Sequence, residues 1–137
     1  MKKSNKIIIG IITTIILIIV AFATYEAVTW NKEYYISEKN IEIPIFLYHD
    51  IVENKEQIEY DYMQTDKETF EKQIKGLLKL DYKIISYEDL VKYKNGEIPI
   101  KKHTCLVDFD DGYEGNYKIA LDIIKKYNIP VSIYVID

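Results

Sequence analysis

The stretch LVDFDDGYEG, residues 106–115, joins the end of an apolar run to three aspartates and a glycine. The run is continuously apolar, which predicts a strand over 104–109 that is buried on both faces of a parallel sheet. Asp-Asp-Gly is favourable turn chemistry, and a carboxylate that caps the following helix would account for one of the aspartates. It does not account for Asp108, Asp110 and Asp111 together, because close carboxylates repel one another unless a cation or hydrogen bonds intervene. A divalent metal would relieve the repulsion, with one carboxylate as ligand and its neighbour as base.

Strands and helices alternate on both sides of this stretch. Apolar runs predict further strands, and stripes at helical spacing after capping residues predict helices between them. We expect strands at 43–48, 83–85 and 131–136, a polar loop at 51–64, a helix after a capping box at 65–68, a helix after Ser86 with Leu90 and Val91 facing inward, and a helix over 116–127 closed by Asn128. This order is typical of an α/β fold with parallel strands.

Sites in parallel α/β folds lie at the carboxyl ends of the strands. Asp110 and Asp111 follow the strand at 104–109, and His49 follows the strand at 43–48, so we expect all three at this functional rim. For His49 a functional and a structural role remain equally open. His103 precedes its strand and is expected at the opposite rim as a structural residue.

The N-terminal segment differs from the rest of the chain. Residues 7–24 are uncharged and almost all apolar, and as a helix they would rise roughly 27 Å, close to the thickness of a hydrocarbon core. Lysines at 2, 3 and 6 favour a cytoplasmic N-terminus with the rest of the chain outside. We therefore predict a membrane anchor or signal segment at 1–25, with cleavage near Ala21-Phe22-Ala23 as the alternative. A linker at 26–42 and a catalytic portion at 43–137 would follow.

Charge and cysteine content limit the possible partners. The formal net charge is −4 and the sequence has no arginine, so nucleic acid is not an expected partner. The single cysteine, Cys105, excludes an internal disulfide and is expected to act as a small buried hydrophobic residue.

Several blocks together resemble the polysaccharide deacetylases of the NodB-homology family. DFDDGY at 108–113 is similar to the first motif of that family, and IPIFLYHDI at 43–51 is similar to its leading strand. TFEKQIKGLLKLDYKIIS at 69–86 and IPVSIYVI at 129–136 look like the helix and strands around that motif. The Tyr-His block further resembles the subgroup that acts on poly-N-acetylglucosamine.

This resemblance implies the N-terminal portion of a distorted (β/α) barrel. It implies metal-dependent removal of N-acetyl groups from an extracellular or cell-wall polysaccharide of N-acetylglucosamine. Asp110 would then be the general base and Asp111 a ligand of a divalent metal, by expectation zinc. The two further histidine ligands of the family are missing from this chain. Asp108 takes the position that threonine holds in the family and receives no catalytic role.

The resembled family's later segments are not found in this sequence, so the chain is expected to be truncated and inactive alone. Two other functions remain open. A haloacid-dehalogenase-like phosphatase would use Asp108 as nucleophile and Asp110 as acid/base, but that pattern requires threonine or valine where this chain has Gly112. The other alternative is a non-catalytic, membrane-tethered remnant.

Overall fold

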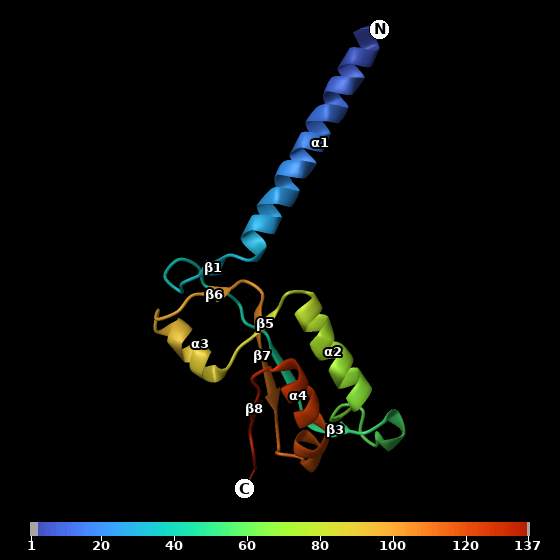
Figure 1. Ribbon diagram of the computed structural model, residues 1–137, viewed down its shortest axis with the longest axis vertical. Coiled ribbons are helices and arrows are strands. Elements are labelled where there is room, and N and C mark those ends of the chain that lie inside the picture. Colours follow the sequence, from blue (N-terminus) through green and yellow to red (C-terminus); the bar gives the residue numbers. More distant parts are fainter. Residues whose placement is uncertain (1–2, 137) are drawn as a thin grey trace. The chain divides into compact units, whose positions relative to one another are not determined.

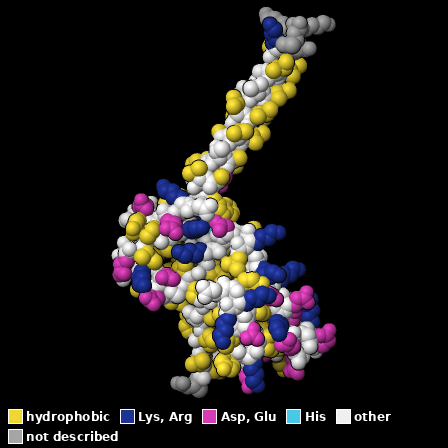
Figure 2. All heavy atoms as spheres, in the orientation of Figure 1, with side chains coloured by type: hydrophobic (Ala, Val, Ile, Leu, Met, Phe, Trp, Pro, Cys, Tyr) yellow, Lys and Arg dark blue, Asp and Glu magenta, His cyan; other side chains and the backbone are white. Residues whose placement is uncertain are grey.

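The computed structural model describes residues 3–136, which divide into two compact units between Lys32 and Glu33. The first unit is one helix, α1 (Lys3–Trp30), which is covered with hydrophobic side chains (Figures 1 and 2). Over Lys6–Trp30 it is long and apolar enough to cross a membrane, although a signal sequence has the same length and composition. The helix therefore includes the predicted apolar run and continues past it.

The second unit is built on a sheet of four parallel strands (Figure 1). They are β2 (Ile45–Tyr48), β5 (Lys83–Ile84), β7 (Thr104–Phe109) and β8 (Ser132–Ile133). The central strand is β7, which pairs with β2 along one edge and with β5 and β8 along the other. Every residue of β7 is buried, as the continuous apolar run predicts. The expected parallel α/β architecture is confirmed.

Two helical segments cover one face of this sheet. Helix α2 (Lys67–Lys79) presents Phe70, Ile74 and Leu77 to it, at helical spacing. The other segment comprises a wide turn, η2 (Asn116–Ala120), and α4 (Leu121–Tyr127). The core between the helices and the sheet contains these buried side chains: Tyr48, Ile51, Phe70, Ile74, Leu77, Ile84, Cys105, Val107, Phe109, Ala120, Ile123, Ile124 and Ile129.

A smaller second core lies around helix α3 (Tyr87–Lys94). Strands β1 (Glu33–Tyr34) and β6 (Ile100–Lys101) pair in antiparallel fashion beside it. The buried Tyr93 hydroxyl donates to the Lys39 carbonyl at 2.9 Å and accepts from the Ile41 N–H at 3.3 Å. Part of the segment predicted as a linker is thus ordered against α3.

Several local predictions were wrong. The expected loop at 51–64 contains the end of β3 (Asp50–Val52) and the short helix η1 (Lys55–Gln57), and β3 pairs in parallel with β4 (Gln64–Asp66). The cap of α2 is Asp66, the last residue of β4, whose carboxylate accepts from the Thr69 N–H, so the cap lies one residue after Thr65. Val91 is 54% exposed, since Tyr93 is the buried residue of α3.

Predictions for the last strand and for the ends of the helices were of mixed accuracy. The strand expected at 131–136 is limited to β8, since only its first residues pair with β7. Asn128 ends α4 in the left-handed conformation, with φ of 49°, as predicted from its place after the last helical turn. The capping box at Ser86 and Asp89 is also present.

Candidate active site

The aspartate turn lies at the carboxyl end of β7. The Asp110 N–H donates to the Tyr48 carbonyl at 2.9 Å, so the first residue after β7 is held against the end of β2. Asp111 and Gly112 follow in the left-handed region, with φ of 65° and 69°. Such backbone is uncommon for aspartate, although Asp tolerates it better than most residues. The turn leaves both Asp110 and Asp111 partly exposed at the rim.

Gly112 suits the left-handed backbone of the turn and lies close to the segment that follows β8. A Cβ at this position would lie 2.8 Å from Cγ1 of Val135, in the segment that follows β8. The Tyr134 N–H donates to the Phe109 carbonyl at 2.8 Å, which keeps that segment beside the end of β7. The turn and the C-terminal segment therefore pack directly against each other.

His49 lies at the same end of the sheet as the aspartates. It follows β2, is half-buried, and is the neighbour of the residue whose carbonyl binds Asp110. The next residue, Asp50, accepts a hydrogen bond from Gln64 Nε2 at 3.1 Å. His103 precedes β7 at the opposite end, where its ring lies edge-on to Tyr82 with centroids 5.5 Å apart. The structure thus brings the predicted rim residues to one end of the sheet and His103 to the other.

Gly115 positions the start of the helix after the turn. A Cβ there would come within 2.0 Å of the Ile51 carbonyl oxygen and 2.5 Å of Asp50 Oδ1. Only glycine allows η2 to approach β3 this closely. This contact is not predicted from the sequence, because residues 51–64 are expected to form a loop and offer no strand for Gly115 to approach.

Asp108 is buried, at 3% exposure, and has one identified partner. The Tyr87 hydroxyl donates to Asp108 Oδ2 at 2.7 Å, while Asp108 Oδ1 has no hydrogen-bond partner within residues 3–136. The rings of Tyr87 and Tyr134 also meet edge to face, with centroids 6.3 Å apart. Hydrogen bonding to Tyr134, and then to Asp108, raises the pKa of Tyr87 above its ordinary value. Burial of this carboxylate disfavours a role as an exposed nucleophile in a phosphatase.

Tyr87 was not singled out from the sequence. Its signal was its place directly after the Ser86 cap, beyond the carboxyl end of β5. A second missed residue is Asn116, which is buried in η2. Its side-chain Oδ1 and Nδ2 have no hydrogen-bond partner in the part of the chain that the structure describes. Cys105 is fully buried, as expected, and burial raises the pKa of its thiol to about 11.

The residues that the structure describes do not form a metal site by themselves. Within this part of the chain, no three His, Cys, Asp or Glu residues are grouped so that they could hold a metal ion. Zinc sites in proteins generally use three or four protein ligands. Asp111 is therefore one potential ligand, and the described residues near it do not supply the others. The divalent metal stays a prediction.

The curated proteins that resemble this chain in sequence have the same kind of name, polysaccharide deacetylase. No family profile matches the chain. The Bacillus subtilis protein YxkH, a predicted polysaccharide deacetylase, is 27% identical over 73% of this chain and 34% of its own length. The poly-β-1,6-N-acetyl-D-glucosamine N-deacetylase of Staphylococcus epidermidis is 35% identical over 56% of this chain and 26% of its own. The corresponding Staphylococcus aureus enzyme is 38% identical over 49% of this chain and 23% of its own.

Solved structures that share the fold of this chain include a deacetylase. Streptococcus pyogenes deacetylase PplD, in complex with acetate, has a TM-score of 0.61 and 25% identity over 72% of this chain and 44% of that one. IcaB from Ammonifex degensii has a TM-score of 0.60 and 23% identity over 71% and 39%. The chain spans only about a quarter to a third of the length of the curated relatives that it matches. The curated relatives of this chain are polysaccharide deacetylases, its fold is shared with a solved deacetylase, and it resembles the N-terminal part of the polysaccharide deacetylase family.

Proposed function

We propose that this chain supplies the N-terminal part of a polysaccharide deacetylase domain that removes N-acetyl groups from an extracellular polymer of N-acetylglucosamine. The observation that carries the proposal is the turn at Asp110 and Asp111, held at the end of the central strand beside β2. The names of the Staphylococcus relatives support the choice of polymer.

Asp110 is the proposed general base. Its carboxylate would accept a proton as a water molecule attacks the acetamide carbonyl carbon. The carbon–nitrogen bond then breaks, acetate leaves, and the sugar nitrogen takes up a proton to become a free amine. Asp110 is partly exposed at the rim, so its carboxylate can reach a substrate. Asp108 is buried, so its carboxylate cannot.

Asp111 is the proposed ligand of a divalent metal, with zinc as the expected ion. A bound divalent metal lowers the pKa of water and polarises a carbonyl group. Because the described residues do not complete a ligand set, we assign no step of the reaction through the metal. We propose that the chain releases no acetate unless further ligands are supplied.

We also propose that α1 anchors the protein in the cell membrane with the second unit outside. The length and lack of charge of residues 7–24 support a membrane-spanning helix, and the lysines that precede them support this orientation. Protease added to intact cells should then remove residues after about position 32, and full protection would refute the orientation. N-terminal sequencing of the exported protein separates an anchor from a signal peptide cleaved near Ala23.

A chimera tests the chemistry. Residues 1–137 are followed by the portion of the S. epidermidis deacetylase that lies beyond the matched segment, and acetate release from N-acetylglucosamine oligomers is measured. Asp110→Asn should lower the rate about 10²- to 10⁴-fold with bound metal unchanged. Asp111→Asn should also lower the metal content. The matched control is Asp122→Asn, an exposed carboxylate of α4 that should have no effect.

Asp108→Thr separates the deacetylase from the phosphatase. It restores the residue of the resembled family and should keep deacetylase activity. Loss of activity in Asp108→Thr with full activity in Asp110→Asn, together with phosphate release from an aryl phosphate, would contradict the proposal.

A further inference from the structure

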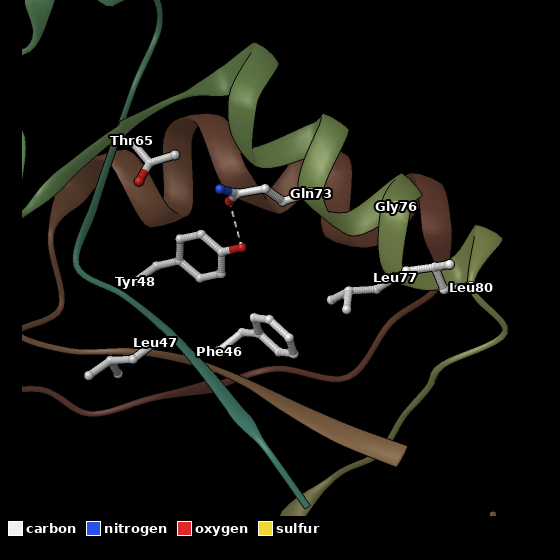
Figure 3. Close-up of a pocket in the computed structure, with 8 residues that line it drawn as sticks. All are labelled: Phe46, Leu47, Tyr48, Thr65, Gln73, Gly76, Leu77 and Leu80. Carbon is white, nitrogen blue, oxygen red and sulfur yellow. Dashed lines mark hydrogen bonds between the residues drawn. The ribbon is translucent and has the colours of Figure 1, made fainter. Parts of the chain in front are cut away.

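A groove and a pocket in the second unit differ in charge. The groove, of about 460 Å³, lies between β2 and α2, and none of the side chains labelled in Figure 3 is charged. There the Tyr48 hydroxyl donates to Gln73 Oε1 at 2.8 Å, so two of its polar groups satisfy each other. The pocket, of about 310 Å³, lies at the amino ends of β5 and β7. We call it the lysine pocket, and its lining is Lys39, Asn40, Ile41, Glu42, Tyr82, Lys102 and His103.

The lysine pocket gathers positive charge that neighbouring carboxylates do not neutralise. In the part of the chain that the structure describes, neither Lys39 nor Lys102 forms an ion pair. The adjacent Lys101 does, with Asp81 at 3.5 Å. The lining holds one carboxylate, that of Glu42, so its two ammonium groups leave it with a positive balance. The whole chain has a net charge of −4, so this pocket has the opposite sign to the rest of the protein.

The backbone on both walls of the lysine pocket is held by hydrogen bonds. The Tyr93 hydroxyl joins the Lys39 carbonyl to the Ile41 N–H, at 2.9 and 3.3 Å. On the other wall, the Lys83 N–H donates to the His103 carbonyl at 2.8 Å. A ligand therefore meets a largely preformed site, and little of its binding free energy goes into ordering the backbone.

The side chains of the pocket match the chemistry of a phosphate group. Phosphate oxygens accept hydrogen bonds, and Lys39 and Lys102 each offer a positive charge with three N–H donors. The side-chain amide of Asn40 is a further donor. Lys39 Nζ lies 5.2 Å from the centroid of the Tyr34 ring, a contact that places the ammonium group without neutralising it. The pocket volume is at the lower end of the roughly 300–1,000 Å³ of small-molecule sites.

The lysine pocket is also close to the proposed membrane anchor along the chain. Lys39 follows Trp30, the last residue of α1, by nine positions, and an extended chain of that length spans roughly 30 Å at most. A site on so short a tether meets the bilayer surface at a high effective concentration. Anionic phospholipids at that surface attract nearby lysines, and each of them carries a phosphate group.

We propose that the lysine pocket binds the phosphate group of an anionic phospholipid through Lys39 and Lys102. The phospholipid as the source of the phosphate rests on the proposed anchor, whereas the phosphate site does not depend on deacetylase activity. The pocket lies at the amino ends of the strands and the aspartate turn at the carboxyl end of β7. Lipid binding would therefore face the aspartate rim away from the bilayer, toward an extracellular polymer.

The test uses the full chain in lipid nanodiscs and follows the reaction of each lysine with acetic anhydride by mass spectrometry. In discs that contain phosphatidylglycerol, Lys39 and Lys102 should react at least about tenfold more slowly than in discs of phosphatidylcholine alone, because each lysine at an anionic surface contributes on the order of fivefold. Lys125, an exposed lysine of α4, is the matched control and should react equally in both discs. Equal protection of Lys125 would overturn the proposal, since it would show a general attraction of the surface to anionic lipid.

Charge-removing variants test whether the two lysines bind one group together. Lys39→Gln should raise the reactivity of Lys102 in phosphatidylglycerol discs about fivefold, and Lys102→Gln should do the same for Lys39. Lys125→Gln should change neither. Both pocket lysines are exposed, so these replacements leave the core intact, which circular dichroism checks. Unchanged protection in both pocket variants would overturn the proposal.

A second arm separates a lipid headgroup from free phosphate. In maltoside micelles, which contain no phosphate, added inorganic phosphate should slow the reaction of Lys39 and Lys102 but not that of Lys125. Protection by inorganic phosphate without protection in phosphatidylglycerol discs would keep the phosphate site and overturn the lipid source. Protection by neither would overturn both. Acetate release is not measured in either arm, so failure of this proposal and failure of the proposed function are distinguished.

Discussion

Strands β7 and β2 lie side by side, run in the same direction and have similarly apolar sequences, yet their surroundings differ. All six residues of β7 are buried, whereas in β2 only Tyr48 is buried and Ile45 and Leu47 are half exposed. The reason is position: among the strands that the structure describes, β7 has neighbours on both edges, whereas β2 pairs with β7 alone. An apolar run therefore predicts a strand, but not how much of that strand the rest of the fold covers.

The same contrast explains why the aspartate turn is well defined. It extends from the most enclosed strand, whose end is tied to β2 by Asp110 and to the C-terminal segment by Phe109. Residues on the open side, such as Leu47, lack this support. The rim therefore combines the end of the enclosed strand β7 with the end of the edge strand β2.

Matched leucines give the largest expected difference between the two strands. Leu106→Ala in β7 should lower the free energy of unfolding by about 2–5 kcal/mol, because it leaves a cavity where the side chain is 2% exposed. Leu47→Ala in β2 should change it by about 0.5 kcal/mol or less. Urea unfolding followed by circular dichroism measures both, and equal losses would mean that β2 is covered in solution.

Gly115→Ala should be the next largest change. The added Cβ would meet the Ile51 carbonyl oxygen at 2.0 Å, which the backbone can relieve only by moving η2 away from β3. Overpacking of this kind costs typically 1–3 kcal/mol. Gly76→Ala is the control, because a Cβ there meets nothing within 4 Å. If both variants unfold at the same urea concentration, the close approach of η2 and β3 is not maintained in solution.

Loss of the α2 cap should have a smaller effect. Asp66→Ala should cost about 1 kcal/mol, because the Thr69 N–H loses its acceptor. The hydrogen bond from Thr69 lowers the pKa of the Asp66 carboxyl. Its contribution is therefore present above about pH 4, the unfolded value, and is lost as the pH falls through the lower folded value. The stability difference from wild type should shrink in acid; a constant difference would exclude this origin.

Of the two substitutions that remove a hydrogen bond, Tyr48→Phe should have the smaller effect at neutral pH. It removes one hydrogen bond to exposed Gln73, at a cost of about 0.5 kcal/mol, the low end of the usual range. Burial raises the pKa of Tyr48 to about 12, so its contribution is complete below about pH 10 and is lost as the pH rises toward 12. The variant should lack this part of the alkaline loss of stability. Identical alkaline profiles would show that Tyr48 is not buried against α2.

Several features could not be predicted from the sequence, for reasons that lie in tertiary contacts. Strands β3 and β4 pair across a loop of polar residues, and neither has an apolar pattern of its own. Because β4 continues through Asp66 and α2 begins at Lys67, the cap of α2 is Asp66 and not Thr65. The partner of Asp108 comes from Tyr87, 21 positions away, and no local pattern links the two.

The sequence by itself determined the order of the four strands of the main sheet and of the helices between them, the buried central strand, and the turn at Asp110 and Asp111. These follow from local apolar periodicity, capping residues and turn chemistry, which act between residues close along the chain. Tertiary structure alone decided that β2 is an edge, that Gly115 must be glycine, and that Asp108 is held by Tyr87. Each depends on which distant segments meet, and burial and steric contact are set by that meeting rather than by sequence pattern.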